Sequence, residues 1–129
     1  GLSRLRHDHN AVFLATCLAM ARWRLGQYDL FTACWQDYGS YLNRERQPKD
    51  EFWVAEMKRV LPLLRAAKAY LEMPEGESPV TKHRELLSGL PLSIPAWARR
   101  AWFRMVLAQH GQRLAGWQRQ WYTLRSWLG

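Results

Sequence analysis

Six arginines near the C-terminal end of the chain have the residue type and the setting of a binding surface. They are Arg99, Arg100, Arg104, Arg113, Arg119 and Arg125. Residues 91–129 contain no Lys, Asp or Glu. A solvated helix face normally mixes the two signs, because unopposed like charges repel. A planar guanidinium forms paired hydrogen bonds to phosphate or carboxylate. The arginines therefore predict contact with a nucleic-acid backbone, an acidic protein surface or anionic lipid headgroups.

Tryptophans accompany these arginines, since five of the eight Trp of the chain lie in residues 91–129. Trp97, Trp102 and Trp127 are candidates for stacking on unpaired bases or for a protein interface. The alternative is that the tryptophans build the core while the stems of the arginines cover its rim. Both interpretations stay open at the level of the sequence.

The other reactive residues form no recognisable catalytic or metal-binding pattern. His7 and His9 flank Asp8, but no second ligand pair follows at zinc-like spacing. We expect His83 and His110 to be solvated or to lie at a helix end. The chain has no Gly-rich phosphate loop, no Gly-x-Ser-x-Gly elbow and no His-Glu-x-x-His motif. The expectation is a non-enzymatic protein with no metal and no cofactor.

Composition places the charge in one part of the chain. Of 129 residues, 19 are basic and 11 acidic, which gives a net charge of +8. The six C-terminal arginines supply +6 of this, and the first 90 residues the remaining +2. The 48% of hydrophobic residues is too high for a disordered chain. No apolar run reaches the roughly 18–20 residues that cross a bilayer, and Cys17 and Cys34 are expected to be buried free thiols in a cytoplasmic protein.

The length predicts one domain over residues 1–129. We divide it into a scaffold over 10–73, a linker over 74–80 and a basic, aromatic helical end over 93–128. The linker is rich in Pro, Gly and Glu. The fold class expected is all-α, a compact bundle of five or six helices, since no alternating strand pattern occurs.

The first half of the chain predicts three helices. Asp8 or Asn10 is expected to cap a helix over 11–25, which Gly26 ends. A second helix is expected over 29–46. The third has the cleanest apolar stripe of the chain, with steps of three and four residues, and Pro62 is expected to kink it. The stripe consists of Trp53, Met57, Val60, Leu64, Ala67 and Leu71.

The second half predicts a short helix over 81–87, capped by Thr81, and a long helical segment over 95–128, capped by Ser93. That segment is either one continuous helix or a helical hairpin broken at Gly111. Its last part carries a second apolar stripe, formed by Leu114, Trp117, Trp121, Leu124 and Leu128. The same stretch has the pattern of an interfacial amphipathic helix, with Arg and Gln opposite the apolar side.

One local resemblance concerns the residues 24–29, Arg-Leu-Gly-Gln-Tyr-Asp, at a predicted turn. The stretch from Ala19 to Tyr38 resembles the helical hairpin of a tetratricopeptide repeat, in which a Gly-x-Tyr turn joins two amphipathic helices. Phe31 and Trp35 would lie on its second helix. The resemblance covers one repeat, and Leu30 stands where a small residue is expected. It implies a protein-interaction adaptor.

The function that these patterns favour is a helical accessory subunit that binds the phosphate backbone of RNA or DNA within a larger complex, for example a ribonucleoprotein effector. Other protein subunits are expected partners. The alternative is an adaptor or chaperone that grips an acidic partner protein through the early hairpin or the Trp-rich end. A peripheral membrane binder is a more remote alternative.

Overall fold

A computed structural model describes residues 2–43, 54–90 and 93–129 of the chain. These residues form six α-helices and one 3₁₀ turn, with no strand among them, so the predicted all-α class is confirmed. The chain divides into two compact units, residues 1–68 and residues 69–129. The division falls inside the third helix, and the predicted linker over 74–80 lies within the second unit.

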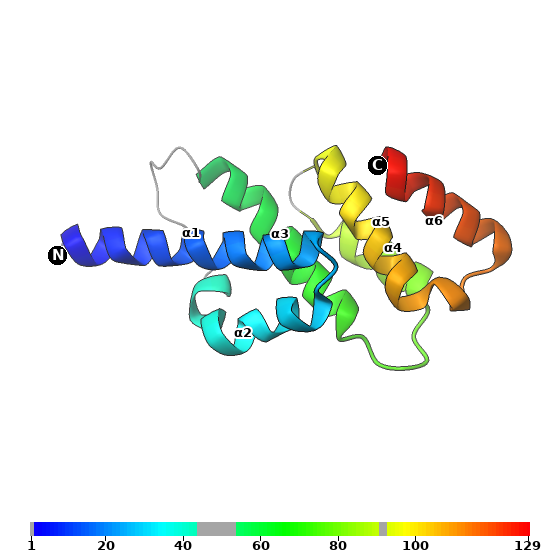
Figure 1. The fold of residues 1–129 in the computed structure, drawn as a ribbon, viewed down its shortest axis with the longest axis horizontal. Helices are drawn as coiled ribbons and strands as arrows, with labels where there is room; N and C mark the ends of the chain where they lie inside the picture. The colour runs from blue at the N-terminus through cyan, green and yellow to red at the C-terminus, as the bar shows by residue number, and fades with distance from the viewer. Residues whose placement is uncertain (1, 44–53, 91–92) are drawn as a thin grey trace. The chain divides into compact units, whose positions relative to one another are not determined.

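The first unit is built on a helical hairpin (Figure 1). Helix α1 spans Leu2–Arg24 and helix α2 spans Tyr28–Leu42, and the two pack against each other. The cap expected at Asp8 or Asn10 is wrong, because both residues lie within α1. The helix begins before them, and no Gly or Pro between residues 2 and 10 interrupts it. The predicted end of the second helix at Arg46 lies outside the described residues.

The turn between α1 and α2 depends on Gly26. Its φ is +76°, and the amides of Gly26 and Gln27 donate to the carbonyls of Trp23 and Arg22. This pair of hydrogen bonds is the Schellman motif, in which the residue after the helix adopts a left-handed conformation. Side chains with a Cβ disfavour that conformation, so Gly26 ends α1 as predicted.

We expect Gly26→Ala to destabilise the chain by about 1–2 kcal/mol, because Ala must adopt the same positive φ. No heavy atom lies within 4 Å of the added Cβ, so the loss arises from backbone strain alone. Urea unfolding of the full chain measures the change. Gly116→Ala is the matched control: its Cβ also meets no atom within 4 Å and its φ is not positive. Equal effects of the two substitutions would contradict this account.

Helix α2 is locally irregular at its centre. Tyr38 has a non-helical φ of −131° and ψ of 22°, directly before Gly39. Gly weakens a helix interior because it adds backbone freedom to the unfolded chain.

Two side chains of α3 contact the α2 region: the Arg65 Nε donates to the Leu42 carbonyl at 2.7 Å, and the Lys68 ammonium lies 5.7 Å from the Trp35 ring centroid.

Helix α3 spans Val54–Leu71 and continues through Pro62. Of its predicted apolar stripe, Val60, Leu64 and Ala67 are buried, which confirms the core face. Trp53 and the Met57 side chain lie outside what the structure describes.

The second unit contains three further helices (Figure 1). Helix α4 spans Pro79–Ser88, α5 spans Ala96–His110, and α6 spans Gly116–Leu128 after a 3₁₀ turn at Gly111–Arg113. The C-terminal segment is therefore the broken form of the two that the sequence allowed. Helix α5 packs against both α4 and α6.

Two predicted helix caps in this unit are wrong. Ser78, not Thr81, caps α4, since its hydroxyl oxygen accepts from the Thr81 amide at 3.3 Å and Pro79 begins the helix. Pro95, not Ser93, stands at the start of α5, with an extended ψ of 156° and no side-chain cap. Each helix begins beside a proline, whose fixed φ suits the first turn.

Candidate nucleic-acid interface

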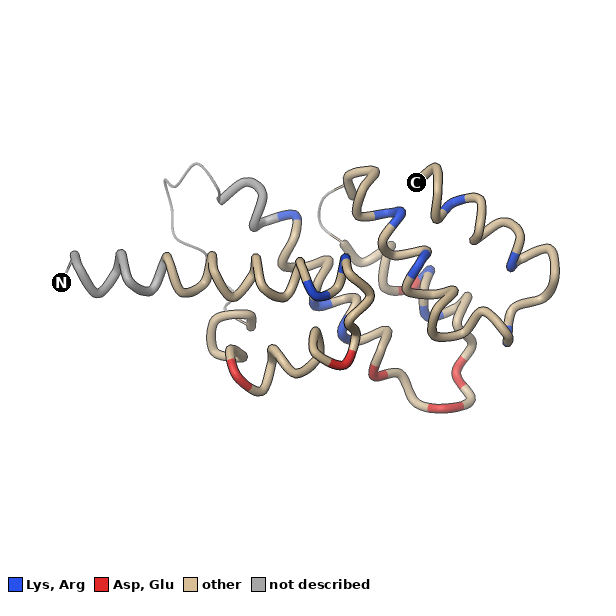
Figure 2. Tube along the Cα trace, viewed as in Figure 1, with Lys and Arg blue, Asp and Glu red and all other residues tan. Residues whose placement is uncertain are grey.

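The six predicted arginines all lie on the hairpin of α5, the 3₁₀ turn and α6. Five are exposed and Arg100 is half-buried. Figure 2 shows that the acidic residues of this unit lie before α5, in the 72–77 segment and on α4. Among the residues that the structure describes, no carboxylate forms an ion pair with any of the six. The guanidinium groups of the hairpin therefore carry an uncompensated positive charge.

The arginines fall into two groups by the way they are held. On α5, Arg100 and Arg104 are one turn apart and Arg99 precedes them; within the described residues their guanidinium groups donate to no protein acceptor. The three later arginines each donate one hydrogen bond to a backbone carbonyl. Arg113 bonds to Glu77 at 2.8 Å, Arg119 to Gly111 at 2.9 Å and Arg125 to Gly129 at 3.2 Å. The other N–H groups of these three guanidiniums remain available to bind a ligand, while the one hydrogen bond to the backbone restricts the position of each side chain.

Arg113 and Arg119 border a shallow concave surface at the junction of α5, the turn and α6. It has a volume of about 720 Å³ and is also lined by His110 and Thr123. Burial, followed by the positive charge of Arg113, lowers the pKa of His110. The Tyr70 hydroxyl forms a hydrogen bond of 2.7 Å with the His110 Nδ1. Arg113 and Arg119 supply the guanidinium groups of this surface.

The apolar side of α6 is largely exposed. Trp117 is 70% exposed and Trp127 78% exposed, and Trp121, Leu124 and Leu128 are exposed as well. The side that packs inward carries Tyr122 and Ser126, which are buried. Of the second predicted stripe only Leu114 is buried. The interpretation of this stripe as core is therefore wrong for α6.

The three tryptophans predicted to stack or form an interface have three different settings. Trp102 is fully buried, so its prediction as a contact residue is wrong: it fills the core of this unit. Trp97 is half-buried, and Trp127 is exposed on α6. Trp117 and Trp121, which the sequence assigned to an apolar stripe, are also exposed. They lie beside polar side chains of α4.

His83 is the residue that the sequence interpretation missed. It was expected to be solvated between Lys82 and Arg84, but it is only 7% exposed. The Trp102 indole donates to its Nδ1 at 2.7 Å. Burial, followed by the positive charge of Arg84, lowers the pKa of His83 to about 4. The spacing Val80, His83, Leu87 was the available signal, because steps of three and four place His83 on the apolar side of α4.

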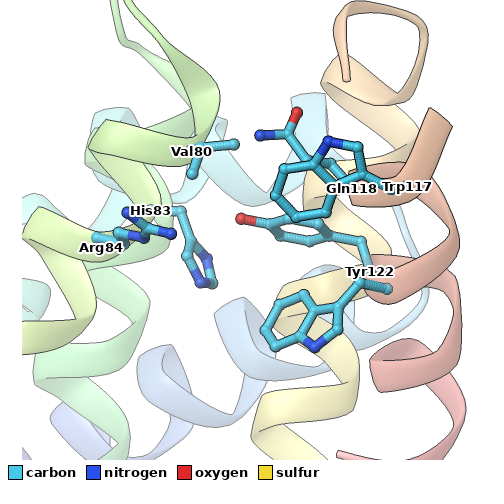
Figure 3. A pocket seen from close by; sticks show the side chains of 7 residues that line it. Val80, His83, Arg84, Trp117, Gln118 and Tyr122 are labelled. Carbon is cyan, nitrogen blue, oxygen red and sulfur yellow. The ribbon is translucent and has the colours of Figure 1, made fainter. Parts of the chain in front are cut away.

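A cavity of about 140 Å³ lies between α4 and α6, and we call it the α4–α6 pocket. In Figure 3, His83 and Arg84 reach into it from α4, and the Tyr122 hydroxyl points towards them from α6. The pocket residues are Val80, His83, Arg84, Trp117, Gln118, Trp121 and Tyr122. The pocket thus combines aromatic walls with several hydrogen-bonding groups.

The cysteines and the potential metal ligands of the described residues form no reactive site. Cys34 is buried and Cys17 half-buried, and both are free thiols. Burial raises the pKa of Cys17 above its ordinary value. In the described ranges no group of three or more His, Cys, Asp or Glu side chains is placed to hold a metal ion. The helices of these ranges include none with the length and apolarity needed to cross a membrane.

Comparisons with known proteins add no relative: no family model matches the chain, and neither a curated protein nor a solved structure gives a significant match.

Proposed function

We propose that the chain is a non-enzymatic helical subunit that binds the phosphate backbone of RNA or DNA through the α5–α6 hairpin. One observation carries the proposal: the six arginines of the α5–α6 hairpin and its turn have no carboxylate partner among the described residues. A phosphate supplies what these guanidinium groups lack, since it accepts paired, charge-assisted hydrogen bonds. The fixed positions of Arg113 and Arg119 reduce the side-chain entropy lost on binding.

We expect the full chain to bind a labelled mixed-sequence 30-mer of RNA or DNA with an affinity that falls steeply between about 50 and 200 mM salt. Replacing Arg99, Arg100 and Arg104 with Ala removes three phosphate contacts. The slope of log affinity against log salt should then become shallower by about 2–3. Fluorescence anisotropy at several salt concentrations measures both quantities.

The matched control removes the same charge elsewhere. Arg24, Arg59 and Lys82 lie on α1, α3 and α4, and their triple Ala variant has the same net charge as the test variant. It should change the slope by less than one. Absence of binding at 50 mM salt, or equal slopes for the two triple variants, would overturn the proposal. Circular dichroism verifies that both variants keep their helices.

A second candidate function, binding of a partner subunit, is favoured by a groove in the first unit. The groove has a volume of about 360 Å³ between α1 and α2, and apolar side chains and two tyrosines line it. Its residues are Ala11, Leu14, Ala15, Leu18, Tyr38 and Tyr41. Exposed apolar grooves of this kind accept an amphipathic helix.

Co-purification tests this second function. A protein partner retained at moderate salt, and lost on Leu14→Asp, would support it. Leu14 is exposed, so the substitution should leave the fold intact. Sedimentation of the chain with anionic vesicles, lost on replacement of Trp121 and Trp127, would instead favour the interfacial alternative.

A further inference from the structure

The α4–α6 pocket contains buried hydrogen-bonding groups that the protein does not satisfy. The Trp102 indole can only donate, so the His83 Nδ1 must accept, and the proton of the neutral imidazole lies on Nε2. His83 is 7% exposed, and no acceptor for its Nε2–H is found in the described part of the chain. The Tyr122 hydroxyl is also without a protein hydrogen bond there, on a side chain that is 3% exposed. Buried polar groups in native proteins are normally paired.

All the polar groups around the pocket can donate hydrogen bonds. Arg84 contributes a guanidinium at the exposed rim. The Gln118 side-chain oxygen accepts from the Ala115 amide at 3.0 Å, which leaves the Gln118 NH₂ as the free end of that side chain. With the His83 Nε2–H and the Tyr122 O–H, the pocket presents four donor groups. It therefore selects a ligand rich in acceptors.

The walls of the pocket select a flat ring. Trp121 is held by edge contacts to Phe103 and Tyr122, whose ring centroids lie 5.5 and 5.2 Å from that of Trp121. The Arg125 guanidinium lies 5.2 Å from the centroid of the Trp121 ring. Trp117 is a freely exposed indole at the entrance. Unpaired bases stack on aromatic faces of this kind. The volume of about 140 Å³ favours a single ring over a fused pair.

We propose that the α4–α6 pocket binds an unpaired keto pyrimidine, uracil or thymine, of a single-stranded nucleic acid. This rests on the proposed function, in which the arginines of the hairpin bind the backbone of the same strand. A keto pyrimidine offers carbonyl acceptors to the His83 Nε2–H and the Tyr122 O–H, while Arg84 and Gln118 donate at the rim. At the same ring position cytosine presents an amino donor and thymine the O4 acceptor, so a group that only donates, such as the His83 Nε2–H or the Arg84 guanidinium, pairs with thymine there and not with cytosine.

The test measures anisotropy of the full chain with three labelled 12-mers of equal charge at about 75 mM salt: oligo(dT), oligo(dC) and an abasic deoxyribose phosphate. Stacking contributes about tenfold or more per base. We expect oligo(dT) to bind at least tenfold more tightly than the abasic 12-mer and more tightly than oligo(dC). Trp117→Ala should lower the oligo(dT) affinity about tenfold and leave the abasic affinity unchanged.

Two further variants make the test specific to the pocket. Trp127→Ala removes an indole that is equally exposed on α6 but does not line the pocket, and it should change the oligo(dT) affinity less than twofold. Tyr122→Phe keeps the buried ring and removes only the hydroxyl, so the ratio of oligo(dT) to oligo(dC) affinity should fall towards one. This variant should fold, because the packing of the ring is unchanged.

The outcomes separate this inference from the proposed function. Equal affinities for the three 12-mers, or equal effects of Trp117→Ala and Trp127→Ala, would overturn the pocket as a base site while the phosphate-binding function stands. Loss of the abasic affinity in Trp117→Ala would also overturn it. Absence of binding to all three 12-mers at about 75 mM salt would overturn the proposed function, and the base site with it.

Discussion

Trp102→Ala is expected to destabilise the chain by about 3–5 kcal/mol, the usual cost of removing a large buried aromatic side chain. Trp102 is fully buried, and its ring lies against Tyr70 and His83 at centroid distances of 5.8 and 6.1 Å. The substitution leaves a cavity and also leaves the His83 Nδ1 without its donor. Urea unfolding of the full chain, followed by circular dichroism, measures the loss.

Two comparisons give this prediction its specificity. Trp127→Ala makes the same chemical change at a side chain that is exposed on α6, and it should alter stability by no more than about 0.5 kcal/mol. Trp102→Phe keeps most of the ring volume and removes the indole donor. It should cost about 1–3 kcal/mol, because a buried acceptor is left unpaired. Equal losses for Trp102→Ala and Trp127→Ala would show that Trp102 is not part of the core.

The helices of this chain could be predicted because their signals are local. The stripe containing Val60, Leu64 and Ala67 depends only on spacing, and the end of α1 depends on the single requirement of a positive φ at Gly26. The break of the C-terminal segment was left open, and it occurs at Gly111, which begins a 3₁₀ turn. Helix starts were predicted less well. Pro79 occupies the first turn of α4, so Ser78 rather than Thr81 is its cap, and Pro95 itself stands at the N-cap of α5, two residues after Ser93.

The exposure of the apolar side of α6 could not be predicted, because the spacing of apolar residues does not show whether another part of the chain packs against them. Helix α6 approaches α5 with its smaller residues instead. Ser126 is buried, and a Cβ added to Gly129 would lie 3.2 Å from the Ala96 carbonyl oxygen. Such a close approach lets Tyr122 reach Phe103, with ring centroids 5.4 Å apart. The tryptophans on the other side are consequently left exposed.

The pocket shows the same limit of sequence reasoning. Its donors come from two helices, α4 and α6, which are separated in the chain by α5 and the 3₁₀ turn, and each donor has an ordinary local explanation. Lys82 and Arg84 made His83 look solvated, and no sequence pattern singled out Tyr122. Only the packing of α4 and α6 around α5 turns the two residues towards one cavity. The arginines could be predicted from composition, whereas the neighbouring base site required the tertiary structure.

Acid is expected to destabilise the second unit through His83. The pKa of this imidazole is about 4 in the folded chain and 6.5 in the unfolded chain. Between these values the unfolded state binds more protons than the folded state, so stability falls as the pH falls from about 6.5 to about 4. A difference of about 2.5 pKa units corresponds to at most about 3 kcal/mol. Protonation also places a hydrogen on Nδ1, which then cannot accept from Trp102.

His83→Gln separates this contribution from those of the other histidines. The Gln side-chain oxygen can accept from the Trp102 indole but does not titrate, so urea unfolding of the variant should show a weaker loss of stability between pH 6.5 and 4.5. His110→Gln is the comparison: the pKa of His110 is lowered in the same direction, at a less buried site, so its removal should flatten the profile less. Arg84 on its own helix and Tyr122 on α6 are the other charged and titratable groups that act on His83, and burial raises the pKa of Tyr122 further above this range. A pH profile of His83→Gln parallel to that of the original chain would show that the buried imidazole does not couple folding to pH.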